Sequence, residues 1–136
     1  MKIFKKLRAK HIKLGFKGEK LSYKLLKSKQ YQILCRGYRP KNRSGEIDII
    51  ARDGRTLCFI EVKTRYKPNQ NYYTNKIWVS KNQISRIKKA ARSYLNEISM
   101  EKINYRFDLI EVSINKYGLK SIYHWQRDFG IFLPGS

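Results

Sequence analysis

Residues 45–65 read GEIDIIARDGRTLCFIEVKTR, and the dipeptide Asp53-Gly54 separates two apolar runs within them. An Asp-Gly pair between two strand-like runs is a strong local signal for a β-hairpin. We therefore predict a strand over 46–52 and a second, antiparallel strand over 56–63. Both runs are apolar on their two faces, which is typical of strands in the interior of a sheet that helices cover.

The residues before the hairpin predict a helix and one more strand. A helix over 15–29 places small and apolar residues on one stripe, and such a stripe allows a close approach to a sheet. The members of this stripe are Gly15, Gly18, Ser22 and Leu25. The run 31–38 then reads as a strand that stops before Pro40 and a polar turn.

The residues after the hairpin predict a second helix and two closing strands. Segment 64–79 is polar and aromatic without a clear period, so we expect a long loop or lid there. Ser80 and Gln83 have the spacing of a capping box. Apolar residues then follow at helical spacing, namely Ile84, Ile87, Ala91, Tyr94 and Ile98. Segments 104–114 and 119–125 read as strands joined at Gly118.

This order of elements predicts one α/β domain with three layers, in which helices flank a central mixed sheet. A chain of 136 residues fits a single domain over 1–136, and we assign 1–14 to a basic N-terminal arm. Cys35 and Cys58 both lie in apolar runs, so we expect buried free thiols in a reducing, cytoplasmic environment. The chain has no run of 18 apolar residues, and we predict no membrane span.

The charge of the chain points to a polyanionic partner. The formal net charge is +21, and residues 1–44 contain fifteen Lys and Arg with Glu19 as their one acidic residue. An excess of this size favours nucleic acid first and an anionic membrane surface second. Because no base-reading motif is present, we expect contacts to phosphates and recognition of shape rather than of sequence.

Three polar residues in the hairpin are the candidates for chemistry. Glu61 and Lys63 are two apart in a strand, so their side chains point to the same face. Antiparallel pairing brings Asp48 next to Glu61. Two carboxylates and an amine at the end of an interior hairpin are suited to Mg²⁺ and a phosphodiester. A purely structural ion pair between Lys63 and one of the carboxylates is the alternative.

The same residues carry a family resemblance. The strings Gly-Glu-Ile-Asp-Ile-Ile at 45–50 and Phe-Ile-Glu-Val-Lys-Thr-Arg at 59–65 resemble the PD-(D/E)XK nuclease superfamily. More closely, the chain resembles the YraN-like family of small predicted endonucleases, which are similar to archaeal Holliday junction resolvases. Gly18-Glu19, Ser80-Lys81 and Arg106-Phe107-Asp108 match that family in order and spacing.

The resemblance implies a restriction-endonuclease-like core and a metal site for Mg²⁺ or Mn²⁺. In this site Asp48 and Glu61 are ligands with the Val62 carbonyl nearby, and Lys63 is the catalytic lysine. Glu19 maps onto an acidic residue that joins the metal site of related resolvases, although an acid near a helix start is also favourable by itself. A resolvase-like reaction needs two active sites, so a homodimer is expected by analogy with those resolvases.

Further residues have open assignments at this point. We expect phosphate contacts from seven residues: Lys17, Lys20, Arg43, Arg65, Lys81, Gln83 and Arg86. Glu46 and Asp108 either support the metal ligands from behind or form structural pairs with Arg43 and Arg106, and we favour the structural pairs. His11 and His124 lack metal-ligand spacing and are interpreted as incidental. The aromatic residues of the loop serve either stacking on bases or loop packing, and these are Tyr66, Tyr72, Tyr73 and Trp78.

The leading hypothesis is therefore a Mg²⁺-dependent endonuclease that acts on branched or structured DNA. A non-catalytic module that binds DNA or structured RNA on the same fold is the main alternative. The paired carboxylates weigh against it, because a pure binder has no need of clustered acids facing a polyanion. A third hypothesis is a protein that attaches to anionic membrane surfaces through residues 1–17.

Overall fold

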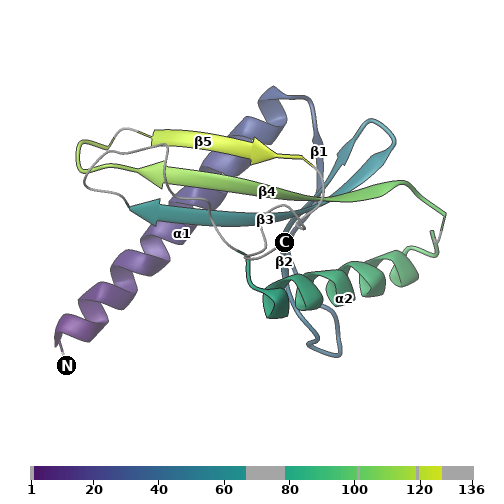
Figure 1. Ribbon diagram of the computed structural model, residues 1–136, viewed down its shortest axis with the longest axis horizontal. Coiled ribbons are helices and arrows are strands. Elements are labelled where there is room, and N and C mark those ends of the chain that lie inside the picture. Colours follow the sequence, from purple (N-terminus) through teal and green to yellow (C-terminus); the bar gives the residue numbers. More distant parts are fainter. Residues whose placement is uncertain (1, 67–78, 101, 119, 127–136) are drawn as a thin grey trace.

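Two helices and five strands make up the described part of the chain, in the predicted order α-β-β-β-α-β-β. The computed structural model describes residues 2–66, 79–100, 102–118 and 120–126, apart from the side chains of 2–4, 6–8, 11 and 12. The elements are α1 (Lys2–Ser28), β1 (Gln32–Tyr38), β2 (Ile47–Asp53), β3 (Thr56–Tyr66), α2 (Lys81–Glu97), β4 (Tyr105–Ile114) and β5 (Lys120–Trp125) (Figure 1).

The strands form one mixed sheet in the order β1-β2-β3-β4-β5. β1, β2 and β3 are antiparallel neighbours, β3 and β4 are parallel, and β5 returns antiparallel to β4. Parallel neighbours require a crossover connection, and α2 supplies it between β3 and β4. The hairpin strands β2 and β3 are therefore interior strands, which confirms the prediction from their apolar faces.

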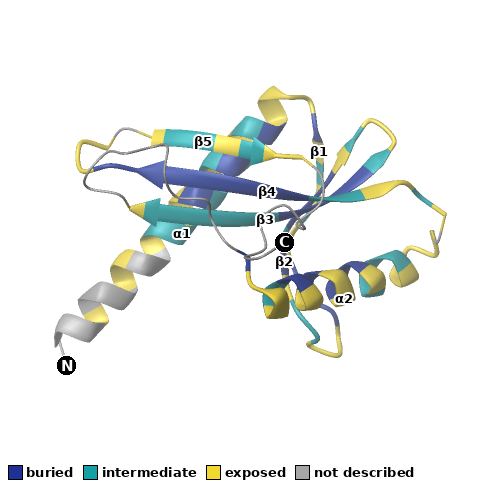
Figure 2. Ribbon diagram, in the orientation of Figure 1, coloured by how far each residue is buried: buried dark blue, intermediate teal, exposed yellow. Residues whose placement is uncertain are grey.

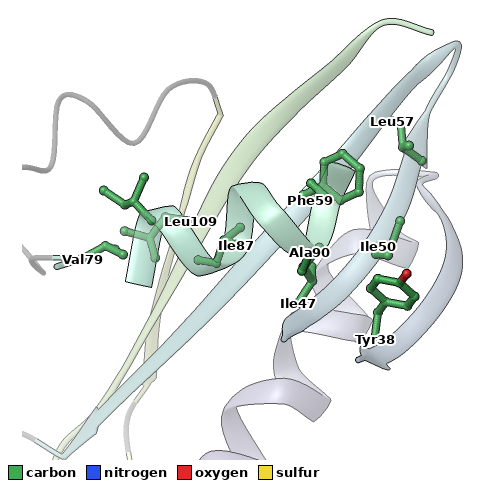
Figure 3. Packing of buried hydrophobic residues seen from close by; sticks show 11 residues of the cluster. Tyr38, Ile47, Ile50, Leu57, Phe59, Val79, Ile87, Ala90 and Leu109 are labelled. Atoms are coloured by element: carbon green, nitrogen blue, oxygen red, sulfur yellow. The ribbon is translucent and has the colours of Figure 1, made fainter. Parts of the chain in front are cut away.

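Each face of the sheet has its own apolar core under one helix, which makes the fold three-layered. On one face, Ile87 and Ala90 of α2 pack in a cluster with Phe59 of β3. Figure 3 shows these α2 side chains on the side of the helix that faces the strands. On the other face, Leu26 of α1 packs in a cluster with Ile60. Figure 2 shows β4 as largely buried and β5, at the edge of the sheet, as intermediate or exposed.

Several predicted boundaries were wrong. The first helix begins at Lys2 rather than at residue 15, so the predicted basic arm is helical. β3 continues to Tyr66, so the predicted loop begins later than residue 64. At its other end Val79 lies outside any helix or strand, as predicted, and its side chain is fully buried in the core. Ile98 is the C-cap of α2 and is 38% exposed. Cys58 is buried as predicted, whereas Cys35 is only half-buried, and both thiols are free.

Neither described helix combines the length and the apolar character that a membrane crossing requires. Residues 67–78, which include Tyr72, Tyr73 and Trp78, lie outside the described residues. The predicted stacking role of these aromatic residues therefore stays a prediction. Tyr66, at the end of β3, is 54% exposed.

Gly18 is the small residue that allows α1 to lie against the sheet. A Cβ built at Gly18 would overlap Oγ1 of Thr64 in β3 and come within 2.8 Å of its Cβ, whereas a Cβ at Gly15 would meet nothing within 4 Å. The predicted stripe is thus confirmed at Gly18 and wrong at Gly15. At the end of the stripe, Leu26 rather than Leu25 is fully buried.

Gly18→Ala and Gly15→Ala are expected to change stability in opposite directions. At Gly18 the overlap with Thr64 should outweigh the better helix propensity of Ala and destabilise the fold by about 1 to 3 kcal/mol. At Gly15 the propensity gain should stabilise the fold by up to about 1 kcal/mol. Urea unfolding of both variants checks this expectation, and equal stabilisation by the two substitutions would contradict the close contact.

Candidate active site

Asp48, Glu61 and Lys63 lie together at the end of the hairpin away from its turn. Ile49 pairs with Ile60, so the next residues along the two strands, Asp48 and Glu61, are neighbours. Oδ2 of Asp48 accepts a hydrogen bond from the Val62 amide at 2.8 Å. Nζ of Lys63 lies 3.3 Å from Oε1 of Glu61. The predicted juxtaposition of the three side chains is confirmed.

The two carboxyl groups share a poorly hydrated environment. Burial, reinforced by the Asp48 carboxylate, raises the pKa of Glu61 to about 8, although the Lys63 ammonium opposes this rise. Burial also raises the pKa of Asp48, against the stabilising hydrogen bond from the Val62 amide. The direct contact with the Asp48 carboxyl group raises the pKa of Glu61 further. Two acids that resist joint ionisation are suited to a cation between them.

Glu19 approaches this pair from α1. Burial raises the pKa of Glu19, and the charges of Asp48 and Glu46 raise it further, so the three carboxylates share one electrostatic environment. The neighbouring Tyr23 ring on α1 stacks under the guanidinium of Arg36, with 4.1 Å between the guanidinium carbon and the ring centroid. α1 is therefore held with Glu19 on its side toward the site.

The carboxylate pair opens into a basic cleft of about 1010 Å³ between the β1–β2 connection and α2. The cleft lining includes Asp48 and Glu61 together with three of the residues predicted to contact phosphate, which are Arg43, Gln83 and Arg86. Gln83 also completes the capping box with Ser80, as its spacing predicted. The acids therefore lie in a concave surface that is otherwise rich in cations.

Four other residues predicted to contact phosphate do not line this cleft. Lys17 and Lys20 are exposed on α1, Lys81 is exposed in the first turn of α2, and Arg65 is half-buried in β3. Sequence spacing placed them in the basic part of the chain or next to the motif, but it did not show which face they occupy. Their role as phosphate contacts stays a prediction.

Two further cations line the cleft without having been predicted, Arg39 and Lys41. The run Arg-Pro-Lys-Asn-Arg at 39–43 was the available signal, because a basic turn just before the strand that carries Asp48 borders the same surface. Glu46 pairs with Arg39 at 3.4 Å, so the expected pairing with Arg43 was wrong. A Cβ at Gly45 would overlap the Arg86 carbonyl, so this turn packs directly against α2.

A second ionic cluster lies on the other face of the sheet and is structural. Asp108 is fully buried, and it accepts a hydrogen bond from Nε of Arg106 at 3.0 Å, which confirms that predicted pair. Nε2 of His124 lies 2.8 Å from Oδ2 of the same carboxylate. The His124 side chain is only 2% exposed, so the interpretation of this histidine as incidental was wrong.

The donor set at Asp48 and Glu61 suits Mg²⁺ or Mn²⁺ better than a metal that needs a full protein cage. Within the described residues, no group of three or more His, Cys, Asp or Glu side chains is arranged to hold a metal. Mg²⁺ is commonly bound by one or two carboxylates, with waters and substrate phosphates as the other ligands. Asp48 and Glu61 fit this pattern, and the roles of Glu19 and of the Val62 carbonyl as ligands stay predictions.

The raised pKa of Glu61 predicts a pH-dependent stability in the presence of EDTA. Its pKa is higher in the folded protein than its ordinary value of 4.5, so proton binding to Glu61 stabilises the folded state. This stabilisation is complete below about pH 4.5 and is lost as the pH rises through about 8. At about 1.4 kcal/mol per pKa unit, the loss amounts to a few kcal/mol. Urea unfolding between pH 5 and 9 measures it.

Glu61→Gln is the matched control for this titration, because an amide does not ionise. The variant should lose less stability than the wild type over the same pH range, and Mg²⁺ should stabilise the wild type more at pH 9 than at pH 6. The same pH profile in both proteins would contradict the assignment of the raised pKa to Glu61.

Comparison with known proteins gives the family of this chain. The model of the uncharacterised protein family UPF0102 matches residues 18–112. A UPF0102 protein of Chlorobium limicola is 46% identical over 73% of this chain and 74% of its own length. A UPF0102 protein of Christiangramia forsetii is 40% identical over 91% of this chain and 99% of its own length. The chain therefore belongs to the UPF0102 family, which is the YraN-like family that its motifs resemble.

Proposed function

We propose that this protein is a metal-dependent endonuclease that hydrolyses phosphodiester bonds in branched or structured DNA. The observation that carries the proposal is the position of Asp48 and Glu61 in the lining of a basic cleft, with Lys63 beside Glu61. If the cleft only bound a polyanion, two acids in its lining would weaken that binding. Carboxylates that face a polyanion are useful when they hold a cation that the phosphate also binds.

The side chains have distinct roles in the proposed hydrolysis. Asp48 and Glu61 hold Mg²⁺, which when bound polarises the scissile phosphate and lowers the pKa of a water. Lys63 lies beside Glu61 and orients the attacking water or donates to the phosphate oxygen on which charge develops. The water oxygen bonds to phosphorus and its proton passes to solvent, while one phosphorus–oxygen ester bond breaks and the leaving oxygen takes a proton from solvent.

The cleft supports a nucleic acid substrate through its cations. Arg43, Arg86, Arg39 and Lys41 line the same concave surface as the carboxylates. Arg and Lys side chains neutralise phosphates with little dependence on base sequence. The cleft cations would therefore hold the backbone on both sides of the scissile bond, and substrate choice would depend on the shape of the nucleic acid.

The resemblance of the two hairpin strands to the PD-(D/E)XK nuclease superfamily agrees with this assignment. In the superfamily pattern the acid of one strand and the Glu-x-Lys of the next form a metal site with a catalytic lysine. The chain has Asp48 on β2, and it has Glu61 and Lys63 on β3, so each required residue is present in the matching strand.

A cleavage assay tests the proposal. Supercoiled plasmid, four-way junction, flap and single-stranded DNA are incubated with the purified protein in Mg²⁺, Mn²⁺ or EDTA. We expect metal-dependent cutting with a preference for the branched substrates. Binding with equal affinity in EDTA and no cutting with either metal would instead support the non-catalytic binding module.

A further inference from the structure

The solvent face of α1 contains a continuous row of lysines. Six lysines follow one another at intervals of three or four residues, and all six side chains are exposed: Lys10, Lys13, Lys17, Lys20, Lys24 and Lys27. Positions three and four apart lie on the same face of a helix. At a rise of about 1.5 Å per residue, the row is about 25 Å long.

The row is a costly arrangement for the helix by itself. Like charges three or four residues apart on a helix repel one another and reduce its stability. None of the six ammonium groups forms an ion pair with a described residue. Glu19 does not relieve the repulsion, because it faces the carboxylates of the active site. A polyanion along the row would remove this cost.

The row and the basic cleft lie on different surfaces of the fold. α1 packs on the sheet through Gly18, Ser22 and Leu26, which are buried on the side of the helix away from the row. α2, which lines the cleft, belongs to the apolar cluster on the other face of the sheet. Figure 1 shows α1 crossing behind the strands and extending beyond them toward its N-terminus. A nucleic acid segment bound in the cleft would therefore leave the lysine row free.

We propose that the lysine row of α1 binds the phosphate backbone of a second DNA duplex segment while the cleft holds the first. The inference rests on the proposed function for the identity of the segment in the cleft. The protein then holds two segments of one branched molecule, or two separate duplexes, at the same time.

The chemistry of the row favours a duplex over other polyanions. Phe16, which is 69% exposed beside Lys13 and Lys20, is the one exposed aromatic side chain among the described side chains of α1, whereas proteins that bind single strands commonly use several aromatic stacking platforms. A helix that binds a membrane surface inserts an apolar face into the lipid. The apolar residues Leu26, Leu21 and Leu14 of α1 pack instead in the core of the protein. A cationic row along one side of a helix is matched by a stiff duplex with a dense line of phosphates.

A bridging assay tests the inference without any cleavage. Full-length Asp48→Asn protein is mixed in EDTA with a biotinylated duplex on beads and a fluorescent duplex in solution, and captured fluorescence is measured over a range of salt. The row variant combines Lys17→Gln, Lys20→Gln and Lys24→Gln. The control variant removes the same charge at three exposed lysines outside the row and the cleft, by Lys102→Gln, Lys116→Gln and Lys120→Gln.

The row variant should capture at least about tenfold less fluorescent duplex than the control variant at moderate salt. For the row variant, the slope of log affinity against log salt concentration should be less steep by about 2 to 3, since each lost phosphate contact contributes about 0.9 to that slope. Its melting temperature should be unchanged or higher, because the substitutions relieve repulsion along the helix.

Equal bridging by the row and control variants would overturn the inference. Sedimentation with phosphatidylserine vesicles that is lost only in the row variant, with bridging intact, would overturn it in favour of a membrane surface. Wild-type protein that fails to cut DNA but bridges through the row would refute only the nuclease. Protein that cuts DNA without bridging through the row would refute only the second duplex site.

Discussion

Asp48→Asn is expected to reduce metal-dependent DNA cleavage by at least about 10³-fold, which corresponds to about 4 kcal/mol of transition-state stabilisation. The substitution keeps the size and shape of the side chain but removes the charge that would hold the metal. The amide oxygen of Asn still accepts the hydrogen bond that the Val62 amide now donates to Asp48. The variant should therefore fold, and its loss should be confined to catalysis.

The measurement is the initial rate of cutting on the preferred substrate, together with DNA affinity by fluorescence anisotropy. Affinity should be unchanged or higher in the variant, because a negative charge has left a basic cleft. Asp53→Asn is the matched control, since it makes the same substitution at the turn end of the same strand. Equal cleavage by Asp48→Asn and the wild type would remove Asp48 from the site and point to a contaminating nuclease.

Arg106→Met is expected to destabilise the fold by about 3 to 5 kcal/mol without any direct effect on the site chemistry. Its guanidinium bonds the fully buried Asp108 carboxylate, and it also contacts Asp53 at 3.2 Å and the Tyr31 hydroxyl at 2.7 Å. Met keeps much of the side-chain volume but leaves the carboxylate in the interior without its guanidinium partner. Removal of one partner of a buried pair is far more costly than the loss of a surface ion pair.

Thermal and urea unfolding measure this effect, with Arg52→Met on the exposed side of β2 as the control. The double variant Arg106→Met, Asp108→Asn should be more stable than Arg106→Met, because the amide leaves no unpaired charge in the interior. Lower stability of the double variant would contradict the view that the buried charge causes the loss. A small effect of Arg106→Met would show that His124 is a sufficient partner for Asp108.

Local patterns were sufficient to predict the elements that have clear chemical signals. The Asp-Gly turn does join β2 to β3, with Asp53 opposite Thr56. The Ser80 and Gln83 capping box does begin α2. These signals depend on neighbours in the chain, so no distant contact was needed to read them. Helix and strand ends without such signals were misplaced. α1 begins well before the apolar stripe that packs on the sheet. β3 continues to Tyr66 because its last residues pair with β4, a strand that is distant in sequence.

The pairs between distant charged residues were harder to predict. Arg43 is closer in sequence to Glu46 than Arg39 is, yet the turn between β1 and β2 presents Arg39 to this carboxylate. His124 had no recognisable spacing because its partner is on the adjacent strand, where the β4–β5 register brings the two side chains together. A histidine in an edge strand gives no local sign of a buried carboxylate beside it.

The sequence by itself determined the hairpin, the order of the elements and the identity of the three polar residues at its open end. It did so because turn chemistry and strand alternation are local, and because antiparallel pairing fixes which residues face each other. Only the tertiary structure decided which of the many cations share a surface with those residues. Arg39 and Arg86 reach the cleft from different elements, whereas Lys17 and Lys20 are turned away from it by the packing of Gly18 on the sheet. The number of charged side chains follows from the sequence, whereas the surface that each of them occupies depends on which side of its helix is buried.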